Sequence, residues 1–216
     1  MAKPYTTILF DLDGTLTDPK VGITRSVQYA LSKFGLQADP EDLVPFIGPP
    51  LHESFQKFFS FDREQSMQAV AYYREYYSER GIYENAVYPG ITAMLKRLRE
   101  QGRDLAVATS KPTFFAEQVL KHFKLDGFFT VVAGSNLDGT RTDKTEVIRF
   151  ALQQLPSPLP GRTVMVGDRK YDVSGARNCG IDAIAVTYGY GSPAELAQAS
   201  PTYLARSVEE LSRLLG

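Results

Sequence analysis

The sequence predicts an α/β protein, a doubly wound parallel sheet with helices on both faces and a helical subdomain inserted into it. Short β-rich apolar runs alternate with helical patterns through the second half of the 216-residue chain. Residues 20–82, by contrast, show helical spacing and no convincing strand. A chain of this length can bury a sizeable core.

Five apolar runs predict strands. Continuous apolar runs, without alternation of polar residues, fit strands that are buried on both faces of a parallel sheet. The runs are ILF (8–10), LAVAT (105–109), FTVVAG (129–134), TVMVG (163–167) and AIAVT (183–187).

Apolar residues at helical spacing fill the gaps between these runs, which is why we expect helices on both faces of the sheet. The three clearest sets are Ile91, Met94, Leu95 and Leu98, then Phe115, Val119 and Phe123, then Val147, Ala151 and Leu155.

The segment after the first strand is long for a crossover connection. Within it, Ile23, Val27 and Leu31 mark one helix, and residues 63–80 mark another. We therefore expect a catalytic α/β core of residues 1–17 and 86–216, and a helical cap of residues 18–85.

Composition narrows the class of partner and the location. The 24 Lys and Arg against 25 Asp and Glu leave no broad positive surface for a nucleic-acid polymer, so a small molecule is the expected partner. The sequence shows no long apolar run, and we expect neither a membrane span nor an export signal. The single cysteine, Cys179, excludes an internal disulfide and fits a reducing compartment, so we expect a cytoplasmic protein.

Polar residues gather where the predicted strands end. In an open parallel sheet, ligands bind beyond the carboxyl ends of the strands, so residues just after each apolar run are the candidates for a site. They are Asp11, Asp13, Gly14 and Thr15 after the first run, Thr109, Ser110 and Lys111 at the second, Asp168 after TVMVG with Asp172 one helical turn on, and Lys144 at a helix start.

These residue types suggest phosphoryl transfer. Carboxylates converging at one edge repel each other unless a cation lies among them, and oxygen-only ligands favour Mg²⁺. The hydroxyl of Thr109, the ammonium of Lys144 and backbone N–H groups around Gly14 and Ser110 could cradle a phosphate.

DLDGT, VATSK, Lys144 in RTDKTEVI, and GDRKYD resemble the four signature motifs of the haloacid dehalogenase superfamily, specifically its phosphatases with a helical cap. The resemblance covers essentially the whole chain in the right order, with the insertion where such a cap belongs. It implies an Mg²⁺-dependent phosphomonoester hydrolase that acts on a small phosphorylated metabolite through an aspartyl-phosphate intermediate.

Residue roles follow from the same resemblance. Asp11 would be the nucleophile, and Asp13 would be the general acid toward the leaving group and then the base for water. The Asp11 carboxylate, the Asp13 main-chain carbonyl and Asp168 would hold Mg²⁺. Asp172 would orient a metal-bound water or Lys144.

Phosphate contacts are assigned in the same way. Thr109 and Lys144 would bind phosphate oxygens, with backbone N–H groups from Gly14 and Ser110.

Departures from the family pattern bear on the subfamily. Many relatives follow the phosphate-binding lysine with proline, whereas Thr145 follows it here, and Arg169 and Lys170 stand where small residues are frequent. These departures resemble a 5′-nucleotidase-like or phosphoglycolate-phosphatase-like branch. In the cap, Arg25 and His52 are candidate substrate contacts. The physiological substrate and the oligomeric state stay open.

Particular sequence features weigh against other functions of this fold. A dehalogenase would not need Asp13 or a metal, and a signalling receiver would not carry the long helical insertion. A phosphonate hydrolase would need an imine-forming lysine in the cap, for which Lys20, Lys33 and Lys57 are formal candidates. A phosphomutase of the same fold and a catalytically silent relative that binds a phosphorylated ligand remain alternatives.

Overall fold

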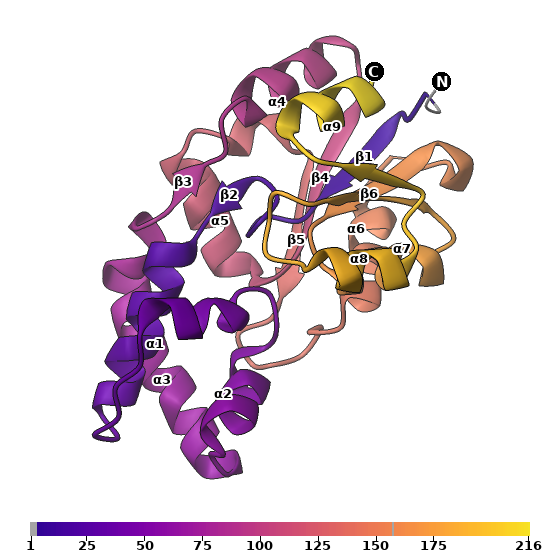
Figure 1. Ribbon diagram of the computed structural model, residues 1–216. Helices are drawn as coiled ribbons and strands as arrows, with labels where there is room; N and C mark the ends of the chain where they lie inside the picture. The colour runs from indigo at the N-terminus through magenta and orange to yellow at the C-terminus, as the bar shows by residue number, and fades with distance from the viewer. Residues whose placement is uncertain (1–3, 157) are drawn as a thin grey trace. The chain divides into compact units, whose positions relative to one another are not determined.

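The computed structural model describes residues 4–156 and 158–216 and divides the chain into two compact units (Figure 1). Met1–Asp18 and Val87–Gly216 form an α/β unit, here called the core unit, and Pro19–Ala86 form the helical unit. Within the described ranges, no helix is long and apolar enough to cross a bilayer.

A six-stranded sheet forms the centre of the core unit, and all its neighbouring strands run parallel, which confirms the predicted fold class. The strand order is β5-β4-β1-β6-β7-β8. The bounds are β1 Thr7–Phe10, β4 Asp104–Pro112, β5 Val131–Ser135, β6 Thr163–Gly167, β7 Asp182–Val186 and β8 Tyr203–Ala205.

Helices connect the strands of the core unit. They are α4 Ile91–Glu100, α5 Thr113–His122, α6 Lys144–Gln154, α7 Lys170–Asn178, α8 Pro193–Ala199 and α9 Val208–Leu214, with short 3₁₀ turns at η3 Asp126–Phe128 and η4 Pro160–Arg162. Apolar residues of α6 and α7 pack with Leu9, Ala106 and Met165 of the sheet in one buried cluster.

The order of the strands places a switch point at β1. Successive strands β1, β4 and β5 step toward one edge, and α6 then carries the chain back to β6 on the other side of β1 (Figure 1). Ligands bind beside such a reversal, at the carboxyl ends of the strands. The residues that follow β1, β4 and β6 therefore lie where a binding site is expected.

The main differences from the sequence prediction lie at strand ends and at the sheet edge. β4 continues beyond Thr109 to Pro112, because its register with β5 shifts between Ala108 and Pro112. The edge strand β8 was not predicted, since it has only three residues and its Leu204 is 45% exposed. Its three residues, Tyr-Leu-Ala, are too few for periodicity to distinguish a strand from a helix.

The helical unit contains α1 Lys20–Ser32, η1 Pro40–Phe46, α2 Leu51–Phe59, α3 Arg63–Glu79 and η2 Gly81–Tyr83. A capping box between Asp62 and Gln65 begins α3. A Cβ on Gly22 would lie 1.9 Å from the carbonyl oxygen of Gly81, so α1 requires glycine where it passes η2.

The short strands β2 Thr17–Asp18 and β3 Ala86–Val87 pair with each other.

Candidate active site

The loop that follows β1 carries the first acidic residue of the site. The Asp11 amide donates to the Val166 carbonyl at 2.8 Å, which extends the pairing of β1 with β6. The Leu12 amide donates to Asp11 Oδ1 at 2.8 Å and so restricts rotation of this buried carboxylate. Gly14 then turns the chain with φ +79°, and a Cβ there would lie 2.3 Å from Asp168 Oδ2.

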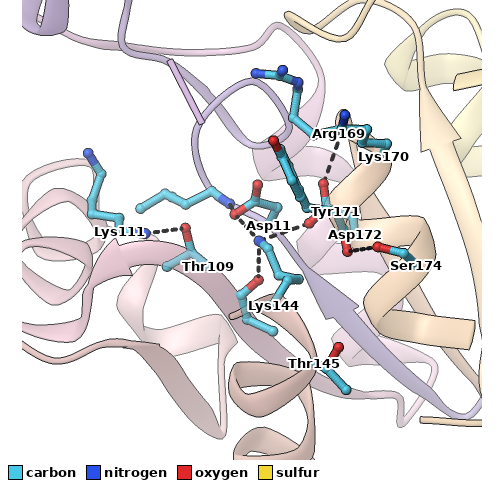
Figure 2. A network of polar contacts seen from close by, with 12 residues as sticks. Asp11, Thr109, Lys111, Lys144, Thr145, Arg169, Lys170, Tyr171, Asp172 and Ser174 are labelled. Atoms are coloured by element: carbon cyan, nitrogen blue, oxygen red, sulfur yellow. Dashed lines mark hydrogen bonds and ion pairs between the residues drawn. The ribbon is translucent and has the colours of Figure 1, made fainter. Parts of the chain in front are cut away.

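Lys144 lies at the centre of the site. It is the first residue of α6, whose N-cap Asp143 accepts from the amide of Thr145 at 2.8 Å. Lys144 Nζ lies 3.1 Å from Asp11 Oδ1 and 2.8 Å from Asp172 Oδ1, and it donates to the Ala108 carbonyl at 3.1 Å (Figure 2). Its side chain is 4% exposed.

Electrostatics keep this lysine charged. Burial alone would lower the pKa of Lys144, but the carboxylates of Asp11 and Asp172 outweigh it, so the pKa lies above its ordinary value. A buried ammonium is therefore available to contact an anionic group.

Three buried carboxylates converge on the same point. Asp11, Asp168 and Asp172 each offer an oxygen within 4.8 Å of the others. Burial, with the charges of Asp11 and Asp172, raises the pKa of Asp168 to about 8. Burial also raises the pKa of Asp172 to about 6, although Lys144 opposes the shift. The charge of Asp11 thus makes ionisation of both Asp168 and Asp172 harder.

A divalent cation fits this arrangement. Asp168 is 1% exposed, and its Oδ1 has no hydrogen-bond partner within residues 4–156 and 158–216. Such a buried oxygen is costly unless a ligand satisfies it. The set consists only of hard oxygen ligands, as Mg²⁺ prefers. The carboxylates of Asp11 and Asp168 could therefore hold the ion.

The raised pKa values predict how stability depends on pH. Without divalent cations, we expect the free energy of unfolding to fall as pH rises from about 5 to about 8. Asp168 and Asp172 bind protons more tightly in the folded chain than in the unfolded chain, where their pKa is 3.8. Protonation of these two residues therefore stabilises the fold fully below pH 3.8, and this stabilisation is lost as pH rises through about 6 for Asp172 and about 8 for Asp168. Urea denaturation in the presence of chelator measures this trend.

Added Mg²⁺ is the control for that experiment. The cation should flatten the pH trend because it neutralises the same carboxylates. Asp138 and Glu195 have lowered pKa values, which would make stability rise with pH, but both groups titrate below pH 5 and so do not oppose the trend. A constant or rising stability between pH 5 and 8 with chelator would contradict the arrangement of charges described here.

Lys111 is a site residue to which the sequence analysis gave no role. Its Nζ lies 2.8 Å from Asp13 Oδ2, and its side chain is 6% exposed. Burial raises the pKa of Asp13, while Lys111 opposes the shift. The Lys111 amide donates to Thr109 Oγ1 at 3.2 Å (Figure 2). The signal was a lysine directly after the Thr-Ser pair at the end of a predicted strand.

The remaining predicted contacts fall into two groups. Thr109 is buried and lies with Ser110 on β4, next to β1, where the Ser110 carbonyl accepts from Ser135 Oγ at 2.9 Å. Arg25 and His52 belong to the helical unit. Arg25 pairs there with Glu84, and His52 Nε2 lies 3.9 Å from Glu53 Oε1. Their role as substrate contacts stays a prediction.

Residues 188–191, with the sequence Tyr-Gly-Tyr-Gly, also belong to the site and were missed. The amide of Tyr190 donates to Asp168 Oδ2 at 2.7 Å, and the hydroxyl of Tyr188 donates to the Thr15 carbonyl at 3.0 Å. This segment follows the predicted strand AIAVT, so the rule that identified the other strand ends applies to it as well.

Comparison with known proteins identifies the family. The family model of haloacid dehalogenase-like hydrolases matches residues 8–186, which include the acidic cluster and Lys144. The chain belongs to this family. The predicted resemblance is thereby confirmed, and the chain is an enzyme of the phosphatase class.

Relatives of this haloacid dehalogenase-like hydrolase carry several names. A 5′-nucleotidase of Pseudomonas aeruginosa is 45% identical and aligns over 99% of this chain and 97% of its own length. Tyrosine-protein kinase PtkA of Mycobacterium tuberculosis is 42% identical over 97% of this chain and 72% of its own. The crystal structure of a predicted phosphatase from Clostridium acetobutylicum is 47% identical, covers 98% of both chains and superposes with a TM-score of 0.93.

Proposed function

We propose that this haloacid dehalogenase-like phosphatase is an Mg²⁺-dependent phosphomonoester hydrolase that acts on small phosphorylated metabolites through an aspartyl-phosphate on Asp11. One observation carries the proposal. Oxygens of Asp11, Asp168 and Asp172 lie within 4.8 Å of one another, and Lys144 Nζ contacts two of these carboxylates. The cluster supplies a nucleophile, ligands for a cation and a charge for phosphate in one place.

Asp11 is oriented for attack on phosphorus. Lys144 and the Leu12 amide both contact Oδ1, so we assign the other oxygen, Oδ2, as the nucleophile. The bond from Oδ2 to phosphorus forms as the bond from phosphorus to the leaving oxygen breaks, and Asp13 gives that oxygen a proton. Asp13 then takes a proton from the water that attacks phosphorus, which releases phosphate and restores Asp11.

The other polar residues bind and orient the phosphate. We assign the Thr109 hydroxyl and Lys144 Nζ to phosphate oxygens, helped by backbone N–H groups of Gly14 and Ser110. Mg²⁺, held by Asp11, Asp168 and the Asp13 main-chain carbonyl, would neutralise the repulsion between nucleophile and phosphate. Asp172 holds Lys144 in place by an ion pair of 2.8 Å.

The relatives and the departures from the family motifs also bear on which substrate the enzyme acts on. The name of the Pseudomonas relative supports a 5′-nucleotidase-like activity, and the departures around Lys144 and Asp168 also fit a phosphoglycolate-phosphatase-like one. We propose a small metabolite of one of these two kinds, and a cytoplasmic location in keeping with the single cysteine.

Metal dependence provides the test. We expect hydrolysis of an aryl phosphate to disappear with chelator and to return with excess Mg²⁺, since the carboxylates need a cation to approach a phosphate dianion. A panel of nucleoside monophosphates and phosphoglycolate, assayed by phosphate release, would then rank the substrates. Turnover that is insensitive to chelator would refute the proposed mechanism.

A further inference from the structure

We propose that Tyr190 is a positioning residue for Asp168: its main-chain amide sets the orientation of the carboxylate, and its hydroxyl anchors that amide through Asp18. The inference rests on the proposed function, because it takes Asp168 as a ligand of Mg²⁺.

The segment 188–191 packs closely against Asp168. A Cβ on Gly189 would lie 2.4 Å from the Asp168 Cβ and 2.3 Å from the Gly14 carbonyl oxygen, and one on Gly191 would lie 1.9 Å from the Asp168 carbonyl oxygen. Real Cβ atoms do not approach other atoms so closely. The backbone on both sides of Tyr190 therefore packs directly against Asp168, which only glycine permits.

Between these two glycines, the Tyr190 amide donates to Asp168 Oδ2 at 2.7 Å. The second oxygen, Oδ1, is buried and has no hydrogen-bond partner in the part of the chain that the structure describes. A carboxylate held by one oxygen can rotate little about its side-chain bonds, so the amide presents Oδ1 to a ligand. Groups that orient metal ligands in this way commonly determine metal affinity.

The Tyr190 side chain fixes the segment 188–191 through a second contact, made by its hydroxyl. It donates to Asp18 Oδ1 on β2, within the core unit. Tyr190 thus bridges Asp18 and Asp168 with two different groups, the phenol and the amide. Loss of the phenol contact would loosen the turn while leaving the amide and the Asp168 side chain chemically intact.

Tyr190→Phe tests this assignment, with Mg²⁺ binding to the resting protein measured by isothermal titration calorimetry. We expect the dissociation constant for Mg²⁺ to rise about tenfold, as for other groups that orient a metal ligand. In aryl phosphate hydrolysis, the half-saturating Mg²⁺ concentration should rise by a similar factor, and kcat at saturating Mg²⁺ should fall less than the affinity does.

Tyr5→Phe is the matched control. The Tyr5 hydroxyl donates to Asp182 Oδ2 at 2.8 Å, which is also a Tyr–Asp hydrogen bond of the core unit, but Asp182 begins β7 whereas the site lies past the strand ends. This variant should bind Mg²⁺ like the unsubstituted protein. It therefore separates a general loss of stability from a specific loss of metal affinity.

Changes at Asp18 test the anchor from the other side. Asp18→Ala should also weaken Mg²⁺ binding, and the loss in the double variant should be clearly smaller than the sum of the two single losses, because both substitutions remove the same hydrogen bond. Asp18→Asn keeps an oxygen that can accept the hydroxyl and should restore most of the affinity.

The outcomes are distinct. Equal Mg²⁺ affinity in Tyr190→Phe and Tyr5→Phe, or additive losses in the double variant, would overturn the role of Tyr190 and leave the proposed function standing. Failure of the unsubstituted protein to bind Mg²⁺ would overturn both.

Discussion

Replacement of Asp11 by asparagine is expected to lower aryl phosphate hydrolysis by at least about 10³-fold, because loss of a covalent nucleophile removes the step on which the others depend. The amide has nearly the same shape as the carboxylate but is a poor nucleophile. The measurement is phosphate release at saturating Mg²⁺, in protein whose melting temperature has been compared with that of the unsubstituted chain.

The fold should survive this substitution. Lys144 keeps its contacts to Asp172 at 2.8 Å and to the Ala108 carbonyl at 3.1 Å, and one of three mutually repelling carboxylates is removed. Asp126→Asn, on an exposed 3₁₀ turn, is the matched control and should retain full turnover. If Asp11→Asn hydrolysed the ester at the control's rate, the nucleophile would have to be another group.

Replacement of Lys144 by methionine is expected to lower the free energy of unfolding by about 3–5 kcal/mol in the presence of chelator. The change keeps an unbranched side chain of similar length but leaves Asp11 and Asp172 buried without their cation. The loss should be larger at pH 8 than at pH 5.5, because Asp168 and Asp172 carry more negative charge at the higher pH. Urea denaturation at the two pH values measures it.

Lys96→Met is the control for this prediction. Lys96 is exposed on α4 and pairs with Glu100 across 4.0 Å, so its replacement should cost less than about 0.5 kcal/mol. Added Mg²⁺ should recover part of the stability of Lys144→Met and none in Lys96→Met. Equal losses in the two variants would mean that Lys144 does not neutralise the acidic cluster.

The predicted elements were those that leave a strong pattern. β1, β4, β5, β6 and β7 are buried in a parallel sheet and therefore appear as unbroken apolar runs. β2 and β3 have two residues each, and α8 and α9 have seven, which is too short for periodicity to show.

The same reasoning explains which site residues were found. Asp168 and Lys144 are charged residues at the ends of predicted elements, so topology alone places them near Asp11. The ion pair of Lys111 with Asp13 depends on the reach of two side chains, which a sequence pattern does not encode. Tyr190 contacts Asp168 through its amide, a group that every residue except proline carries.

The position of β1 in the sheet has a consequence for synthesis of the chain on the ribosome. β1 ends at Phe10, but the strands on its two sides begin only at Asp104 and Thr163, after the whole helical unit has been made. The four residues of β1 can therefore be buried only after strands far along the chain have been synthesised. Such pairing between distant segments slows folding, and an apolar strand that is still unpaired is prone to aggregation. We expect nascent chains that stop before β6 to depend on chaperones.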